Sequence, residues 1–284
     1  MSNSHEAQPA GRRADTNPHG EERLPEEVRT LMRTFVPRLR DEVGDLLVGV
    51  YVVGSAASPD YEPASSDIDV CVVLNRKLKP NEVERLRALH RILPEETPQG
   101  GNLELDYVAQ DQLRPSGAEG DVASISPGEE LRTDHNTSGA DDIWGARELG
   151  VPIFGPPPSE VFPKVDQETL AQSMREWLDD LVSREQRSPA SDQEYADWTL
   201  NIARCLFGIA HGRGSTKPEA AEWLARQEPD RKPALEAALA ARRGAQTPHA
   251  VKAGFHQYAE KADSLAKLKL NGSDLEADRG DDAK

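Results

Sequence analysis

The sequence predicts an α+β protein: an N-terminal half built on a mixed sheet with helices, followed by a C-terminal helical bundle. Its 284 residues allow one large domain or two modest ones. In the first half, apolar runs of strand length alternate with helical patterns, which indicates helices packed on a sheet. From about residue 167 onward, every periodic stretch is helical.

The first half contains three predicted strands. A helical pattern begins at Glu26, and Pro37 inside it predicts a break or a kink. Residues 46–53 are almost continuously apolar, as in a buried central strand. A second strand opens at residue 67, and a third covers residues 103–108. Residues 81–93, between these two strands, place apolar side chains on one helical face.

The second half contains five runs compatible with helices, at residues 168–182, 194–212, 217–227, 234–243 and 250–268. Residues 155–163 are rich in proline and are interpreted as a linker. We therefore expect a sheet domain at 23–157 and a helical domain at 158–270. The polar ends, 1–22 and the acidic 271–284, are expected to be disordered.

The formal net charge of −16 argues against a nucleic-acid binder, because such proteins contact phosphates with basic residues. The acidity fits either simple solubility or a face for a polycationic substrate, and net charge does not separate the two. No apolar run approaches the roughly 18 residues of a membrane span, and the first residues lack a signal-peptide core. We expect a cytoplasmic protein, a monomer rather than an oligomer, with Cys71 and Cys205 as small buried hydrophobes.

Four acidic residues are the candidate chemical centre. Asp67 and Asp69 are two apart on one strand, so their side chains point to the same face. Glu104 and Asp106 have the same relation on the next predicted strand. Carboxylates on otherwise apolar strands are costly to bury without a partner. Mg²⁺ favours a few carboxylates plus phosphate oxygens, so the pair formed by Asp67 and Asp69 suits a metal-bound nucleotide.

The end of the first strand supplies a phosphate-binding candidate. Gly54 lacks a side chain, so its backbone can approach a phosphate closely, and Ser55 can donate a hydrogen bond to it. An isolated Gly-Ser or D-x-D is common and carries little weight. Their conjunction with acids on a third strand favours a functional site.

Gly54-Ser55, eleven further residues and then D-x-D resemble the signature of the polymerase-beta-type nucleotidyltransferases. The segments WGARELGVPIFGPPP and EYADWTLNIARCLFGIAHGRGSTKPEAAEWL resemble the aminoglycoside adenylyltransferases that act on streptomycin and spectinomycin. The resemblance covers about residues 45–245, with gaps.

The resemblance implies a role for each candidate residue. Ser55 and Ser66 would contact nucleotide phosphates, and Asp67 and Asp69 would hold Mg²⁺. Glu104 would be the catalytic base and would lie at the metal site. In the helical domain the resemblance implies triphosphate contacts from Arg204 and Lys217, and an aminoglycoside-binding region at Glu194 and Asp197.

The residues of the helical domain also make physical sense. Glu194 and Asp197 share a helical face that suits a polycationic sugar, and Tyr195 or Trp198 could cover the apolar face of a ring. A solvated helix start explains the acids equally well. Arg204 lies in an apolar helix and needs a partner, for which we expect a phosphate or carboxylate. Lys217 begins a helix, where a nearby anion would offset its conflict with the dipole.

The expected function is transfer of AMP from ATP·Mg to an aminoglycoside hydroxyl, with release of pyrophosphate, giving antibiotic resistance. Two alternatives stay open: another acceptor, either a small molecule or a protein side chain, and a non-catalytic nucleotide-binding regulator. The sequence also does not decide whether Glu104 or Asp106 is the base, because both point to one face.

Overall fold

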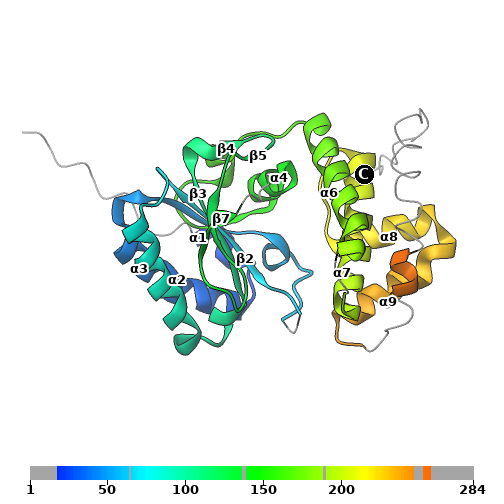
Figure 1. Ribbon diagram of the computed structural model, residues 1–284, viewed down its shortest axis with the longest axis horizontal. Helices are drawn as coiled ribbons and strands as arrows, with labels where there is room; N and C mark the ends of the chain where they lie inside the picture. Colours follow the sequence, from blue (N-terminus) through cyan, green and yellow to red (C-terminus); the bar gives the residue numbers. More distant parts are fainter. Residues whose placement is uncertain (1–17, 64, 136–138, 188–189, 246–251, 257–284) are drawn as a thin grey trace, which may run out of the picture.

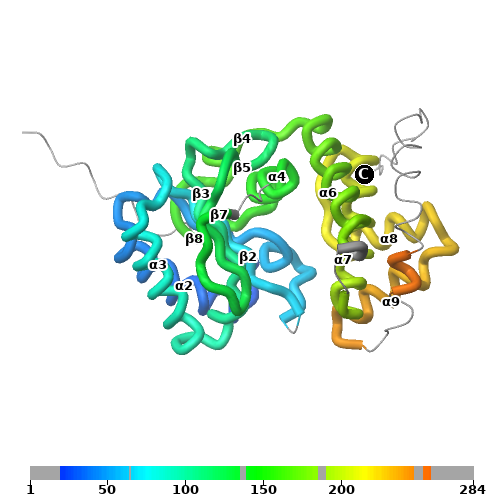
Figure 2. Tube along the Cα trace, in the orientation of Figure 1, coloured from blue at the N-terminus to red at the C-terminus, as the bar shows by residue number. Residues whose placement is uncertain are grey.

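The computed structural model describes residues 18–63, 65–135, 139–187, 190–245 and 252–256. The molecule has two parts, a sheet domain and a helical domain, which face each other across their inner surfaces (Figure 1). The tube in Figure 2 shows that α4 lies between the sheet and helix α6. The predicted α+β class is confirmed.

A six-stranded mixed sheet forms the centre of the first domain, in the order β7-β6-β3-β2-β1-β8. β2 and β3 are parallel, and the other neighbours are antiparallel. The strands are β1 (Leu47–Val52), β2 (Ile68–Leu74), β3 (Leu103–Ala109), β6 (Val122–Ile125), β7 (Arg132–His135) and β8 (Val151–Phe154). A separate pair is formed by β4 (Leu113–Arg114) and β5 (Gly117–Ala118).

Helices α2 (Glu26–Val43) and α3 (Pro80–Glu96) cover one face of the sheet, and their apolar side chains share a core with it. The predicted break at Pro37 is wrong, because α2 runs through this residue without interruption. Phe35 and Val36 beside it are buried in that core, so tertiary packing outweighs the lost helical hydrogen bond.

The other face of the sheet is covered at one end by α4 (Ala140–Leu149) and by the segment predicted to be a linker. That segment contains the short helix α5 (Pro158–Val161), and the ring of Phe162 after it packs edge-on against Tyr51, 5.1 Å between centroids. The expectation of a simple linker is therefore too loose. The buried ring of Phe162 packs this connecting segment against the sheet.

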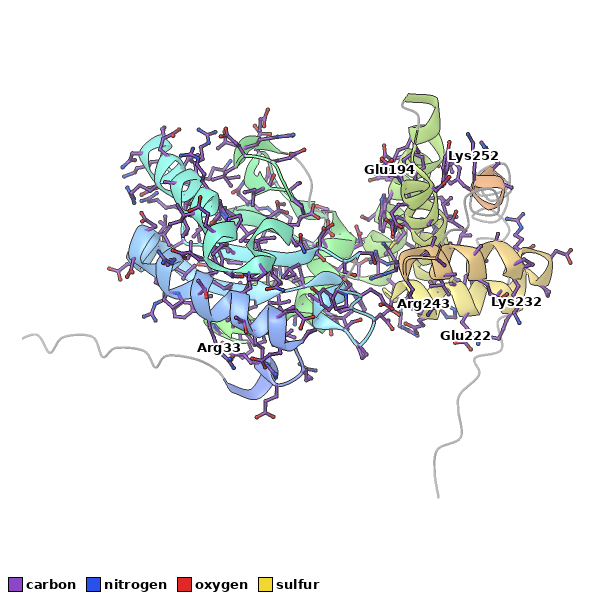
Figure 3. The ribbon with its side chains drawn as sticks, turned by 90° about the horizontal axis from the view of Figure 1, so that it is seen from below. Arg33, Glu194, Glu222, Lys232, Arg243 and Lys252 are labelled. Carbon is purple, nitrogen blue, oxygen red and sulfur yellow. The ribbon has the colours of Figure 1, made fainter. Side chains whose placement is uncertain are left out.

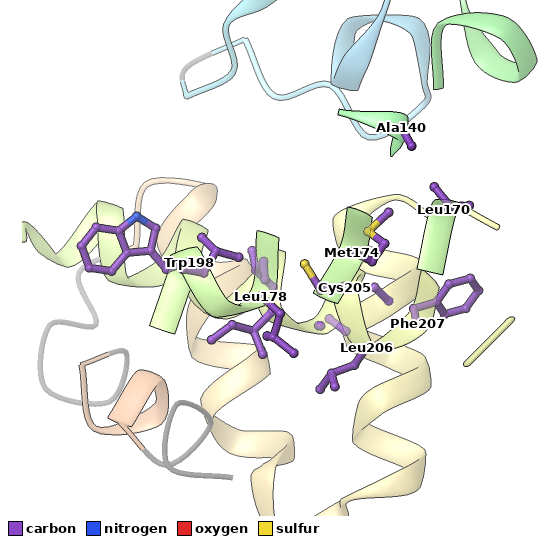
Figure 4. Packing of buried hydrophobic residues seen from close by; sticks show 14 of the residues in the cluster. Ala140, Leu170, Met174, Leu178, Trp198, Cys205, Leu206 and Phe207 are labelled. Atoms are coloured by element: carbon purple, nitrogen blue, oxygen red, sulfur yellow. The ribbon is translucent and has the colours of Figure 1, made fainter. Parts of the chain in front are cut away.

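The helical domain consists of α6 (Gln167–Arg187), α7 (Asp192–His211), α8 (Lys217–Gln227) and α9 (Lys232–Arg242). α7 is the central helix and packs against the other three. Figure 4 shows Ala140 of α4 facing Leu170 and Met174 of α6, so the core of the helical domain continues to the sheet domain. Cys205 is buried in this core as expected, whereas Cys71 is only half-buried.

The expected disordered tail at 1–22 needs one correction: α1 (Pro18–Glu21) is helical and packs against β8. A Cβ on Gly20 would lie 3.0 Å from Val151, so this turn fits closely on the sheet edge. The remaining expected tail residues, 1–17 and 271–284, lie outside the described residues. So does most of the predicted helix at 250–268, of which residues 252–256 are described and helical. Within the described ranges, no helix has both the length and the apolar character needed to cross a membrane.

Candidate active site

The topology brings the acidic residues to one edge of the sheet. β2 and β3 are parallel and begin side by side, with Asp69 directly opposite Glu104 and Cys71 opposite Asp106. Asp67 immediately precedes β2. Asp67 and Glu104 are exposed, and Asp69 is half-buried between them. These carboxylates therefore lie at the same end of two neighbouring strands.

Gly54 lies against the same edge, because β1 runs antiparallel to β2 and ends where β2 begins. Its φ of +62° is in the left-handed region. A Cβ at this position would lie 2.0 Å from Oδ2 of Asp69. Glycine is thus required twice, for the backbone conformation and for the space that the Asp69 carboxylate occupies. Ser55 follows in the short turn Gly54–Ala57 and is half-buried.

The carboxylates raise one another's pKa. Burial, followed by Glu104 and Asp67, raises the pKa of Asp69 to about 7. Burial, followed by Asp67 and Asp106, also raises the pKa of Glu104. Like charges held this close favour a cation between them, and hard oxygen donors suit Mg²⁺. The residues present therefore fit a magnesium ion carried by a nucleotide.

The three-carboxylate metal set predicted for Asp67, Asp69 and Glu104 is not assembled in the structure. Among the residues that the structure describes, no three or more Asp, Glu, His or Cys side chains are grouped to hold a metal. The Asp67–Asp69 pair would need oxygen ligands from the nucleotide itself. Glu104, opposite the pair on the neighbouring strand, stays a candidate base.

Two cations of the helical domain act on this acidic edge. Lys217 and Arg204 both lower the pKa of Asp69, against the larger effects of burial and neighbouring acids. Lys217 also lowers the pKa of Asp67, which Asp197 raises. Residues of α7 and α8 are therefore within electrostatic reach of the metal pair. The structure brings the predicted acidic and basic groups together between the domains.

Lys217 is the first residue of α8, and its Nζ donates to Oδ1 of Asp197 on α7 at 2.8 Å. This confirms the expectation of a nearby anion at an unfavourable helix position. Burial lowers the pKa of Lys217, and Asp197 opposes that effect. Asp197 therefore holds the ammonium group in place and favours its charged form.

Arg204 contacts neutral groups of the protein and not the carboxylate that was one of its two expected partners. Its Nε donates to the carbonyl oxygen of Ser215 at 3.1 Å and its Nη1 to Oδ1 of Asn201 at 3.4 Å, and its guanidinium lies 5.2 Å from the ring centre of Trp177. Neutral groups thus orient the side chain without neutralising it. The positive charge remains available to an anionic ligand.

The predicted acceptor-binding residues are distributed differently from the expectation. Glu194 closes the capping box of α7, and its Oε2 accepts from the backbone N–H and the hydroxyl of Ser191, each at 2.7 Å. Trp198 is 9% exposed and packs with Tyr195 and Phe255 in the helical core. Neither its position nor that of Tyr195 suits stacking on a sugar. Of the proposed acidic face, only Asp197 lies near the metal pair, because helix capping and core packing use the other side chains.

Three residues near the site have no signal in the sequence. Asp142 at the start of α4 is exposed, and Asp106 is close enough to raise its pKa, after larger effects of partial desolvation and of Asp141. Trp177 lies under Arg204. Arg242, in the last turn of α9, contacts Ser66. Each resembles an ordinary cap, core or helix-end residue in the sequence, and only the fold brings them to the site.

Comparisons with known proteins agree with this geometry. A family model described as "Nucleotidyltransferase domain" matches residues 32–124, and one described as "Aminoglycoside adenylyltransferase, C-terminal domain" matches residues 160–267. A crystal structure of spectinomycin adenyltransferase AAD(9) from Enterococcus faecialis with ATP and spectinomycin is similar in fold. It has a TM-score of 0.65 at 17% identity, over 84% of this chain and 98% of that chain. A search of curated proteins found no match.

The sheet domain with its acidic edge, together with the two family matches, defines the chain as an enzyme of the nucleotidyltransferase class. Within that class, the match of the helical half at residues 160–267 identifies it as an aminoglycoside nucleotidyltransferase, and the structural likeness shows that the fold is shared.

Proposed function

We propose that this protein transfers AMP from ATP·Mg to a hydroxyl group of an aminoglycoside of the streptomycin or spectinomycin kind, and releases pyrophosphate. The observation that supports this most strongly is that the Asp67–Asp69 pair at the start of β2 and two cations of the helical domain, Lys217 and Arg204, interact electrostatically. The carboxylates suit the metal, and the two cations suit the triphosphate. The similar crystal structure contains ATP and spectinomycin, which supports both substrates.

Each residue has a defined task in this proposal. Asp67 and Asp69 would hold the Mg²⁺ that arrives with ATP, which supplies neutralisation of the phosphate oxygens. Gly54 and Ser55 lie beside this pair and would bind phosphate oxygens. Lys217 and Arg204 would stabilise the charge that develops on the departing pyrophosphate.

Glu104 would act as the base. It is exposed at the edge of the sheet, so an acceptor hydroxyl can reach it. Its pKa is raised first by partial desolvation and then by Asp67 and Asp106, which brings it closer to the working pH, where a base is most effective. The acceptor oxygen forms a bond to the α-phosphorus, the bond to pyrophosphate breaks, and the hydroxyl proton goes to Glu104. Asp106 is half-buried farther along β3, beside Cys71, and would tune the field around the base.

The acceptor class follows from the charge of the site. Asp197 raises the pKa of Asp67, and Asp106 raises those of Glu104 and Asp142, so further acids lie near the three carboxylates, which suits a polycationic molecule. Asp197 also holds Lys217, so its mutation is expected to disturb nucleotide binding as well as acceptor binding.

The test is pyrophosphate release from ATP by purified protein with a panel of aminoglycosides and, separately, a panel of proteins. Release with streptomycin or spectinomycin, and resistance of cells that express the protein, is the expected result. Release only with protein substrates would contradict the acceptor and retain the chemistry. ATP binding without release in any panel would favour a non-catalytic regulator.

A further inference from the structure

Arg242 joins the helical domain to the loop that precedes the metal pair. It is the last residue of α9 and is 6% exposed. Its Nη2 donates to Oγ of Ser66 at 2.8 Å and to the carbonyl oxygen of Asp60 at 3.3 Å. In return, the hydroxyl of Ser65 donates to the Arg242 carbonyl oxygen at 2.6 Å. In Figure 1 the loop after β1 extends from the sheet toward the helical domain.

These contacts determine what the Ser66 hydroxyl can do. Its oxygen accepts from Arg242 and also from the backbone N–H of Glu62 at 3.2 Å. A hydroxyl has two lone pairs and one proton, so both lone pairs are used. Within the described parts of the chain, the proton of Ser66 has no acceptor at hydrogen-bond distance. Ser66 is therefore set up as a donor, one residue before Asp67.

The charge of Arg242 also lacks a counter-charge. In the ranges that the structure describes, no carboxylate forms an ion pair with this guanidinium, and its acceptors are a hydroxyl and a carbonyl oxygen. A buried guanidinium with neutral partners is costly unless an anion joins it. Arg242 is near Lys217, because it contributes to lowering the pKa of that residue. The positive region around the triphosphate site thus includes a third cation.

We propose that Arg242 is a positioning residue of the nucleotide site: it holds the Ser66 hydroxyl as a donor to a phosphate oxygen and fixes the helical domain over the Asp67–Asp69 edge. This inference rests on the proposed function, since it takes a nucleotide triphosphate as the ligand. Arg242 acts through Ser66 and through its charge, and not on the reacting atoms.

Arg243 provides a matched control. It is the next residue, it is exposed, and its loss removes the same charge from the same helix end. Figure 3 labels its side chain. Arg242→Met and Arg243→Met therefore differ in the contact with the loop and not in net charge.

The experiment is calorimetric titration of the full-length protein with ATP·Mg, on wild type, Arg242→Met, Arg242→Lys, Ser66→Ala, the Arg242→Met/Ser66→Ala double variant and Arg243→Met. A hydrogen bond to a charged group is worth about 1.5 to 3 kcal/mol, so Arg242→Met should weaken ATP binding about 10- to 100-fold. Arg242→Lys should recover part of that loss, because an ammonium group can still donate to Ser66. Arg243→Met should bind as wild type does.

The double variant separates positioning from general destabilisation. If Arg242 acts through Ser66, the two losses are not additive, and the double variant binds little worse than Arg242→Met. Urea unfolding of each variant checks that the protein is folded, and Ser66→Ala alone carries the test if Arg242→Met does not fold.

Equal ATP affinity of Arg242→Met and Arg243→Met, or fully additive losses, would overturn the role of Arg242 while leaving ATP binding by the wild type intact. Failure of the wild type to bind ATP·Mg would instead overturn the proposed function, and this inference with it. Wild-type binding without transfer to an aminoglycoside would refute the acceptor alone.

Discussion

Replacing Asp69 with Asn should stabilise the metal-free protein and abolish transfer. Asp69 is half-buried beside Glu104 and Asp67, and its pKa is raised from 3.8 to about 7. A carboxyl with a raised folded-state pKa binds its proton more tightly when folded than when unfolded. The wild type therefore loses stability as pH rises from about 4 to 7, and stays at that lower level above pH 7.

The size of the effect follows from the shift. About three pKa units, at 1.36 kcal/mol each, correspond to about 4 kcal/mol as an upper limit. Asp69 is not sealed from water, which screens part of this energy, so we expect about 2 to 4 kcal/mol. Asn keeps the size of the side chain and removes the charge, so the packing next to Gly54 is preserved.

The assay is urea unfolding with a chelator at pH 5 and pH 8. Asp69→Asn should exceed the wild type in free energy of unfolding at pH 8, and by less than half as much at pH 5. Asp41→Asn, at an exposed position of α2, is the control and should change little at either pH. Equal stability of wild type and Asp69→Asn at pH 8, or a difference that does not grow with pH, would refute the like-charge account of this site.

Other substitutions test the remaining parts of the site. Lys217→Ala and Arg204→Ala should each weaken ATP·Mg binding about tenfold or more in calorimetry, because each removes a charge that reaches Asp69. Lys232→Ala is the control, since Lys232 also begins a helix and precedes a proline but pairs with Glu236. Unchanged ATP affinity in both Lys217→Ala and Arg204→Ala would contradict the interdomain site. Glu104→Gln should lower kcat by about two to four orders of magnitude with little effect on ATP affinity, whereas Asp106→Asn should cause a smaller loss of kcat. A fully active Glu104→Gln beside an inactive Asp106→Asn would reverse the two roles. Gly54→Ala should abolish transfer and destabilise the protein, because its Cβ would overlap Asp69 at a positive φ, and wild-type turnover would show that the loop adapts freely.

The sequence was sufficient for features that depend on local pattern. Apolar patterns predicted β1, β2 and β3, of which β2 and β3 bring the acids together, and the two-residue spacing of Asp67 and Asp69 predicted their common face. It did not decide whether α2 ends or continues at Pro37, because the burial of Phe35 and Val36 that sustains the helix is a tertiary effect. The short strands β6, β7 and β8 have too few residues for a periodic signal.

The site was predictable where a residue's chemistry conflicts with its local setting. Lys217 at a helix start indicated an anion, and Asp197 is that anion. Trp198 and Glu194 gave no such conflict, and the structure uses them in the core and in a helix cap. Arg242 could not be found from sequence, since a basic residue at a helix end is favourable by itself. Only the fold brings it against Ser66.

The most direct test of the proposed reaction is the mass of the aminoglycoside after incubation with purified protein, ATP and Mg²⁺. Spectinomycin or streptomycin should gain one AMP unit, in step with pyrophosphate release, and should stay unmodified with Asp67→Asn or Asp69→Asn under the same conditions. An unmodified antibiotic in the presence of wild-type protein that binds ATP·Mg, or the AMP unit appearing on protein instead, would contradict the account.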